Sequence, residues 1–377
     1  MRNERLICAV LAAAFLAAAS IAPADVCNSG LQAVAQPTVF PNRSSAAVAW
    51  NGSVLAVAKN ENNFSKTVWV AIYDAGLVQR STDRMVAANT DGGTIALLSN
   101  GIDFALFYRD LQQHLVLQQV TASGDLTGGP VVIAPGRAVW PNQEFDIAWS
   151  AARNGYVILR TVPQGGEKGL YLTTVGPDGS ARSDQLLDLF LGNPATPRLA
   201  VKGDGGLGLV YDRLVSSTLE GLFFMTIDPA NVASSTALVS SAGRNPRLGW
   251  NGNDYLLVAT TFSAGHGALH SIRLSASGQV IAPDALLVAA RGVDVAPLGL
   301  VWNATTSEWA LGYSDSVLGF NVYPGEYRLL RLTPAAARIS DTLFSPDRTK
   351  ATYGTAYAHI WTGTSYNSSI DHLVSPA

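Results

Sequence analysis

Charged side chains are scarce in this chain of 377 residues, because Asp, Glu, Lys and Arg together make up only 14% of it. A soluble domain usually has about 25% charged residues. The 25 Lys and Arg residues are scattered without a basic run, and the formal net charge is −3. Nucleic-acid binding needs a concentrated cationic surface. The sequence therefore argues against a nucleic-acid partner.

Cysteine is almost absent, with Cys8 and Cys27 as the two examples. Cys8 falls inside a predicted signal peptide, so Cys27 would be the only thiol of the mature chain, which excludes an intramolecular disulfide. Lipidation of Cys27 is one alternative, but Val26 stands where bacterial lipoprotein signals have Gly, Ala or Ser. We expect a plain thiol.

Long apolar runs are also missing beyond the N-terminus. Residues 1–24 have the pattern of a signal peptide, with Arg2 and Arg5 before an apolar segment at 6–19 and a small-residue cleavage site at Ala22–Ala24. That segment is too short for a comfortable membrane span. We therefore expect no membrane span in the mature chain, and a secreted, periplasmic or cell-envelope location.

Motifs for cofactors and metals are lacking as well. The five His residues show no HxH or HExxH spacing, and a zinc site needs three or four convergent ligands. The chain has no phosphate loop, dinucleotide fingerprint or nucleophile elbow. We expect no metal and no cofactor.

The chain does contain a repeat of about 50 residues that starts near residue 41. Each copy has an apolar strand, a turn built on Trp-Asn-Gly and a second apolar strand, most clearly around Trp50 and Trp250. A second half follows, with a strand, a Gly turn such as Ser277-Gly278-Gln279, and another strand. Four short strands per repeat of this length predict an all-β fold, a β-propeller of four-stranded blades.

The repeats divide the mature chain, residues 25–377, into blades of a single propeller domain, and we expect a monomer. The predicted blades are roughly 41–90, 91–136, 137–192, 193–243, 244–292, 293–348, and 349–377 plus 25–40. The last blade is shared, because 349–377 offers only the first half of a repeat and 25–40 resembles the second half. The predicted number is seven, with six as the alternative.

The fullest copy of the turn, Trp250 to Val258, has the pattern Trp-Asn-Gly-x-x-Tyr followed by apolar residues. This pattern resembles repeats in secreted bacterial β-propeller-like proteins, most of them uncharacterised. The resemblance covers nearly the whole mature chain and implies a propeller fold, and it says little about activity. The Trp residues of the turns have two interpretations, sugar-stacking platforms or packing between blades, and their repetition favours packing.

Three acidic residues lie at or just after the end of a second strand, each closely preceded by a Tyr. They are Asp110, Asp212 and Asp315. In a propeller this end faces the top, so these acids and Glu326 are weak candidates for acid/base catalysis or for holding a cation. The alternative, which we favour, is polar capping of strand ends.

Loops between the second and third strands vary in length and contain aromatic residues suited to contact surfaces. Binding candidates are Phe64, Phe262, His266, Phe320 and Tyr323. We expect a secreted scaffold that binds a protein or carbohydrate partner through this loop-rich top face. The alternative is an extracellular polysaccharide hydrolase or lyase with acidic residues in the central funnel.

Overall fold

A computed structural model describes most of the repeat region. The described residues are 45–61, 66–75, 78–93, 95–134, 145–164, 167–180, 182–190, 196–215, 218–263, 266–289, 294–316, 326–345, 357–361 and 366–370. The predicted signal peptide, Cys27 and residues 25–40 lie outside these ranges.

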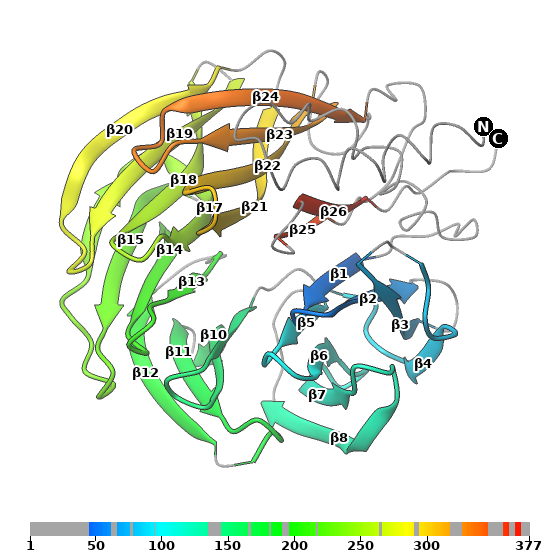
Figure 1. Cartoon of the computed structure of the whole chain (residues 1–377). Coiled ribbons are helices and arrows are strands. Elements are labelled where there is room, and N and C mark those ends of the chain that lie inside the picture. The colour runs from blue at the N-terminus through cyan, green and yellow to red at the C-terminus, as the bar shows by residue number, and fades with distance from the viewer. Residues whose placement is uncertain are drawn as a thin grey trace, which may run out of the picture.

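Strands that follow one another in the chain pair antiparallel into four-stranded blades around a central axis (Figure 1). Blade 1 contains β1 (Ser45–Trp50), β2 (Val54–Glu61), β3 (Thr67–Asp74) and β4 (Arg84–Ala87). Blade 2 contains β5 (Ala96–Ser99), β6 (Phe104–Arg109), β7 (Leu115–Val120) and β8 (Leu126–Ala134). Blade 3 contains β9 (Phe145–Ser150), β10 (Gly155–Gln164), β11 (Glu167–Val175) and β12 (Ser183–Phe190).

The second half of the ring repeats this arrangement. Blade 4 contains β13 (Arg198–Val201), β14 (Leu207–Val215), β15 (Thr218–Ile227) and β16 (Ala237–Ser240). Blade 5 contains β17 (Gly243–Trp250), β18 (Asp254–Ser263), β19 (His266–Ser275) and β20 (Val280–Val288). Blade 6 contains β21 (Asp294–Asn303), β22 (Glu308–Ser316), β23 (Glu326–Leu332) and β24 (Arg338–Ser345). A two-stranded hairpin of β25 (Tyr357–Trp361) and β26 (Tyr366–Ile370) follows.

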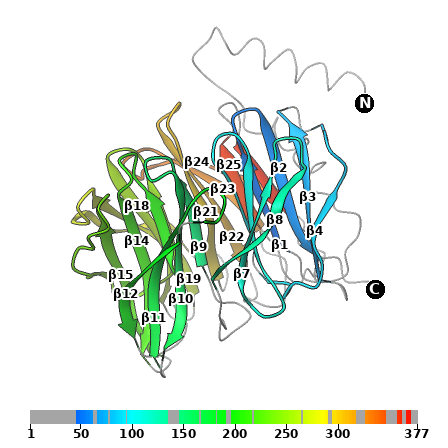
Figure 2. The ribbon, with the colours of Figure 1, turned by 90° about the horizontal axis from the view of Figure 1, so that it is seen from below.

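The first strand of each blade is its innermost strand, and neighbouring innermost strands contact one another in ring order from β1 to β21. The hairpin lies between the two ends of this series, because β25 contacts both β21 and β1. Figures 1 and 2 both show β25 close to the strands of blade 1. The hairpin thus joins blade 6 to blade 1.

The prediction of seven four-stranded blades is wrong, because the structure shows six. Among the described residues after 345, only β25 and β26 form strands, and they make a two-stranded sheet. The sequence count took the turn motif at Trp361 as the first half of a seventh blade, with residues 25–40 as its second half. A first-half motif does not require a second half, and this is the physical reason for the miscount.

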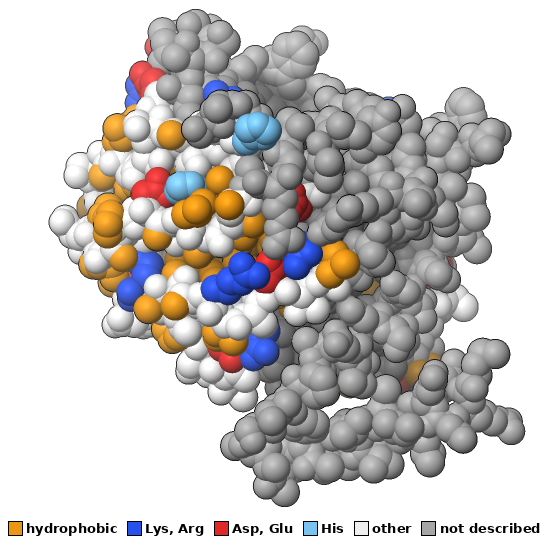
Figure 3. Space-filling view, turned by 90° about the horizontal axis from the view of Figure 1, so that it is seen from above, with side chains coloured by type: hydrophobic (Ala, Val, Ile, Leu, Met, Phe, Trp, Pro, Cys, Tyr) orange, Lys and Arg blue, Asp and Glu red, His pale blue; other side chains and the backbone are white. Residues whose placement is uncertain are grey.

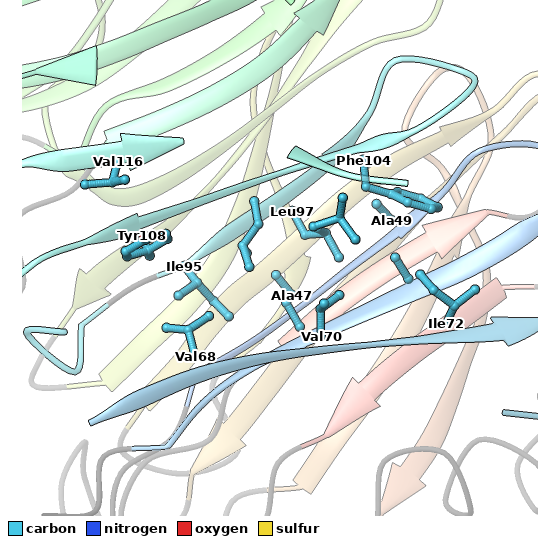
Figure 4. Close-up of a cluster of buried hydrophobic side chains, with 14 residues drawn as sticks. Ala47, Ala49, Val68, Val70, Ile72, Ile95, Leu97, Phe104, Tyr108 and Val116 are labelled. Atoms are coloured by element: carbon cyan, nitrogen blue, oxygen red, sulfur yellow. The ribbon is translucent and has the colours of Figure 1, made fainter. Parts of the chain in front are cut away.

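Hydrophobic side chains fill the spaces between blades. Figure 4 shows one such cluster, in which Val70 and Ile72 of blade 1 lie close to Leu97 and Phe104 of blade 2. A blade has two apolar faces and can bury them only against its neighbours. Each blade therefore depends on the next for its core.

The Trp residues of the turns take part in this packing. The ring centroid of Trp250 lies 4.6 Å from that of Tyr255, the first ring of the following strand. Tyr255 is fully buried and lies 5.4 Å from Phe224 of the preceding blade. Trp302 likewise lies 5.0 Å from Trp309. These rings serve the packing of blades rather than an open sugar platform.

The Asn of the turn holds the hairpin in shape through its side chain. Asn251 Oδ1 accepts hydrogen bonds from the backbone N–H groups of Asn253 at 2.9 Å and Asp254 at 2.8 Å. Gly252, at φ +97°, supplies the left-handed residue that the turn requires. Asn51, Asn100 and Asn303 make the same pair of bonds in blades 1, 2 and 6.

We expect Asn251→Ala to lower the free energy of unfolding by about 1–2 kcal/mol, because two backbone donors lose their acceptor. The matched control is Asn253→Ala in the same turn, where the exposed side chain should change stability by less than about 0.5 kcal/mol. Urea unfolding followed by circular dichroism measures both. Equal losses in the two variants would show that the side-chain bonds contribute nothing.

Candidate functional site

The three predicted acidic residues lie at one end of the propeller, which we call the top face. It is the end at which innermost strands begin and second strands finish. Asp110 forms a β-bridge with Thr90, in the segment that leads from β4 to β5, and Asp315 pairs with Val295 near the start of β21. The acids belong to blades 2, 4 and 6, so another blade separates each from the next in ring order.

Near the end of the second strand, several blades have a buried polar residue at the same position. Its residues are Asn60, Arg109, Thr161, Asp212 and Thr260. Two of them bind the backbone at the start of the next blade: Asn60 Nδ2 donates to the Gly93 carbonyl at 2.7 Å, and Thr260 Oγ1 donates to the Val295 carbonyl at 2.9 Å. This position therefore connects neighbouring blades at the top face.

Asp212 occupies this recurring position in blade 4. Its carboxylate accepts a hydrogen bond from the backbone N–H of Thr196, two residues before β13. The side chain is only 5% exposed. Asp212 thus fixes the backbone where the innermost strand of its own blade begins.

Asp110 shapes the turn between the second and third strands of blade 2. One carboxylate oxygen accepts the backbone N–H of His114 at 2.9 Å, and the other lies 3.0 Å from His114 Nδ1. Both side chains are partly exposed. Asp110 therefore combines a structural bond with a polar contact near the surface.

The pair of Arg109 and Asp91 lies beside this turn and was missed by the sequence interpretation. Arg109 Nε lies 2.8 Å from Asp91 Oδ2, and the two side chains are 3% and 11% exposed. Asp91 Oδ1 also accepts the Gly93 N–H at 2.7 Å. Burial raises the pKa of the Asp91 carboxyl above its usual range, although Arg109 and the Gly93 amide act in the opposite direction.

Two other predicted acids are described less fully. Asp315 is 3% exposed and pairs through its backbone with Glu326 across β22 and β23. The side chain of Glu326 lies outside the described part.

Among the predicted binding residues, Phe64, Phe320 and Tyr323 also lie outside the described residues.

Phe262 and His266 come together on one hairpin of blade 5. Phe262 lies near the end of β18 and is 40% exposed, while His266 begins β19 and is exposed. The guanidinium carbon of Arg244 lies 5.8 Å from the centre of the Phe262 ring. Arg244 was not predicted, although its place one residue into β17 puts it opposite Thr260 at the top face. An exposed ring with a guanidinium beside it suits contact with a partner.

The rim of the propeller presents a different surface. Figure 3 shows hydrophobic side chains scattered among polar ones on the described part of the face in view. The exposed large hydrophobic residues include Leu286 of β20 and Ile339 of β24. His270 Nδ1 lies 2.7 Å from Asp284 on the same outer part of blade 5. Exposed apolar residues are normal on the surface of a soluble protein.

Within the ranges that the structure describes, no group of three or more His, Cys, Asp or Glu side chains is placed to hold a metal ion. The same ranges contain no helix long and apolar enough to cross a membrane.

No protein-family model matches the chain, and no curated protein matches it in sequence. Solved structures do resemble its fold. A quinonprotein alcohol dehydrogenase-like protein from Bacteroides thetaiotaomicron has a TM-score of 0.51 and 13% identity, covering 82% of this chain and 68% of that one. AofleA from Arthrobotrys oligospora has a TM-score of 0.50 and 8% identity, covering 81% and 87%. A putative TolB from Agrobacterium tumefaciens has a TM-score of 0.44 and 11% identity, covering 77% and 94%.

At such low identity, these likenesses concern the fold alone. The chain is a β-propeller repeat protein, as its own sheet topology shows.

Proposed function

We propose that this chain is an exported binding module that contacts a protein or glycan partner through the top face of blade 5. The contact surface, which we call the Phe262 surface, consists of Arg244, Phe262 and His266. The observation that carries the proposal is the exposed Phe262 ring with the Arg244 guanidinium 5.8 Å from its centre. Export is inferred from the signal-peptide pattern at residues 1–24 and places the partner outside the cytoplasm.

The support beneath Phe262 is rigid. β18 pairs with β19 over ten consecutive residue pairs, and Leu257 and Val258 of β18 are fully buried. Binding costs less conformational entropy when a contact residue is already held in place. Aromatic and Arg side chains are also enriched where interfaces derive most of their binding energy.

The local contacts of the acidic candidates favour binding over hydrolysis. A glycosidase of the common type needs two carboxyl groups within about 5–10 Å of each other across a sugar bond. Asp212 instead fixes the backbone of its own blade, and Asp110 closes a turn two blades away. This arrangement gives the binding function the stronger support.

The test is retention of partners from culture supernatant or envelope extract on the immobilised chain. We expect Phe262→Ala to weaken retention at least about tenfold, as for a residue central to an interface. The matched control is Ile102→Ala, an apolar residue that is 73% exposed in a turn of blade 2, at the opposite end of the propeller. The control should retain what the unmodified chain retains. If Phe262→Ala retains the same molecules in the same amounts, the Phe262 surface does not bind the partner.

A further inference from the structure

In the described part of the chain, four positively charged side chains lie over aromatic rings. Measured to the ring centre, the pairs are Arg160 over Tyr171 at 5.4 Å, Lys202 over Trp250 at 6.0 Å, Arg213 over Phe223 at 5.3 Å and Arg244 over Phe262 at 5.8 Å. A cation within about 6 Å of a ring centre is attracted to the electron-rich face of that ring. The same kind of contact can therefore be compared at four places in one fold.

Three of these cations also have an acidic partner in the chain. The distances between nitrogen and carboxylate oxygen are 3.2 Å for Arg160 and Asp184, 2.7 Å for Arg213 and Glu220, and 3.6 Å for Lys202 and Asp204. Each of the three positive charges thus has both a ring and a carboxylate beside it. This is the complete form of the contact in this fold.

Arg244 is the exception, because within the described residues its side chain has the ring but no hydrogen bond or ion pair. The side chain is exposed, and it lies where a register shift between Arg244 and Arg247 interrupts the pairing of β17 with β18. A guanidinium has five N–H donors in a planar fork that fits a carboxylate. The donors of Arg244 are therefore available to an acidic group from outside the chain.

We propose that the Phe262 surface binds a uronic acid unit of an extracellular polysaccharide. The carboxylate of the sugar pairs with Arg244, and the sugar ring lies against Phe262. This inference rests on the proposed binding function of the same surface and names its ligand. The pair of Arg213 and Glu220, with Phe223 5.3 Å from the guanidinium, is the internal example of the arrangement that the ligand would complete. One guanidinium balances the charge of one carboxylate.

The strands around Phe262 leave its ring uncovered on a fixed base. Across β18 and β19, Phe262 pairs with Gly267, which has no side chain to cover the ring. Thr260 lies two residues earlier in β18, on the same face of the strand. It is fully buried, and its Oγ1 donates to the Val295 carbonyl of blade 6 at 2.9 Å. The ring therefore stands at the outer end of a face that blade 6 covers below it.

The size of the surface favours a sugar unit over a protein. A standard protein interface buries about 800 Å² on each partner. A single aromatic side chain buries about 150–250 Å². Among the residues that the structure describes, Phe262 is the one exposed aromatic side chain, at 40%. One ring with one guanidinium matches a single acidic sugar better than the broad apolar core of a protein interface.

Isothermal titration calorimetry of the purified chain at constant ionic strength tests the proposal. The probes are tetramers of galacturonate and of mannuronate, the methyl ester of each tetramer, and a hexa-aspartate peptide. The esters keep the sugar rings but lack the charges. We expect saturable binding of at least one uronate tetramer and at least about tenfold weaker binding of its ester, because a charge-assisted pair is lost.

Three results would overturn the proposal. The first is no saturable binding of either uronate tetramer. The second is equal affinity for a tetramer and its ester, which would show that the carboxylate is not recognised. The third is tighter binding of hexa-aspartate than of both tetramers, which would assign the acidic group to a protein partner.

Variants locate the binding. Arg244→Gln should weaken the affinity for the bound tetramer at least about tenfold, and Arg244→Lys, which keeps the charge without the planar fork, should fall between Gln and Arg. The matched control is Arg80→Gln, which removes the same charge from a side chain that is 64% exposed in blade 1. It should bind as the unmodified chain does. Circular dichroism checks that each variant is folded. Unchanged binding in folded Arg244→Gln overturns the assignment.

Retention of partners from culture supernatant or envelope extract separates this inference from the proposed function. If Phe262→Ala loses the retained molecules and Arg244→Gln keeps them, the Phe262 surface is a binding surface but its ligand is not recognised by a carboxylate. If Phe262→Ala retains the same molecules in the same amounts, binding at this surface is wrong and the uronic acid assignment fails with it. Loss of retention in both variants, with uronate binding as expected, supports both proposals.

Discussion

Replacing Trp309 with alanine is expected to lower the free energy of unfolding by about 3–5 kcal/mol, the range for a large ring removed from a core. Trp309 is fully buried in β22 and lies between two blades. On one side its centroid is 5.0 Å from that of Trp302. On the other side it lies against Gly249 of blade 5, where a Cβ atom would be only 2.5 Å from the ring. Alanine would leave a cavity at the junction of blades 5 and 6.

Equilibrium urea unfolding followed by circular dichroism measures this loss, and two comparisons locate its origin. Trp302→Ala removes a partly exposed ring from the same pair and should cost clearly less. Gly249→Ala would place a methyl group of blade 5 against the Trp309 ring and should also destabilise the fold. Gly129→Ala, with open space around it, should not. If Trp302→Ala and Trp309→Ala cost the same, the junction between the blades is not the source of the stability.

The β-propeller was predictable because the same residue types recur at the turn between the first two strands of several blades. Trp50 and Trp250 stand before Asn-Gly in both copies, and the structure shows why: the Asn caps the turn and the ring packs onto the next strand. Each of these turns needs the same local geometry, so the same residue types recur in it. Such repetition is visible in a single sequence.

The number of blades was not predictable on the same basis. Trp361 ends β25 as Trp50 ends β1 and Trp250 ends β17, yet the described residues after it form only the short strand β26. The turn motif reports the first two strands of a repeat. It contains no information about whether the outer two strands follow.

The buried polar residues that connect blades at the top face were not predicted from the sequence, for a different reason. The recurring position holds Asn60 in blade 1, Arg109 in blade 2 and Thr260 in blade 5. These residues share a place in the fold and a need for buried hydrogen bonds, but not a residue type.

A buried ion pair joins the segment between β4 and β5 to the end of β6, so Asp91→Ala is expected to cost about 3–5 kcal/mol of unfolding free energy. Arg109 is 3% exposed and lies 2.8 Å from Asp91. Without Asp91, its positive charge would remain buried without this counter-ion, and the Gly93 N–H would lose its acceptor at 2.7 Å. Urea unfolding against the unmodified chain measures the loss.

A surface pair in the same two blades provides the matched control. Arg84 of blade 1 lies 2.8 Å from Asp125 of blade 2, with side chains 48% and 58% exposed, so Asp125→Ala should cost less than about 1 kcal/mol. Replacing both buried partners, Asp91→Leu with Arg109→Leu, should recover much of the loss, since no uncompensated charge remains. A double variant as unstable as Asp91→Ala would show that the loss comes from the Asp91 turn itself. The two results together decide whether the stability lost in Asp91→Ala comes from burial of the Arg109 charge or from the shape of the loop that leads into β5.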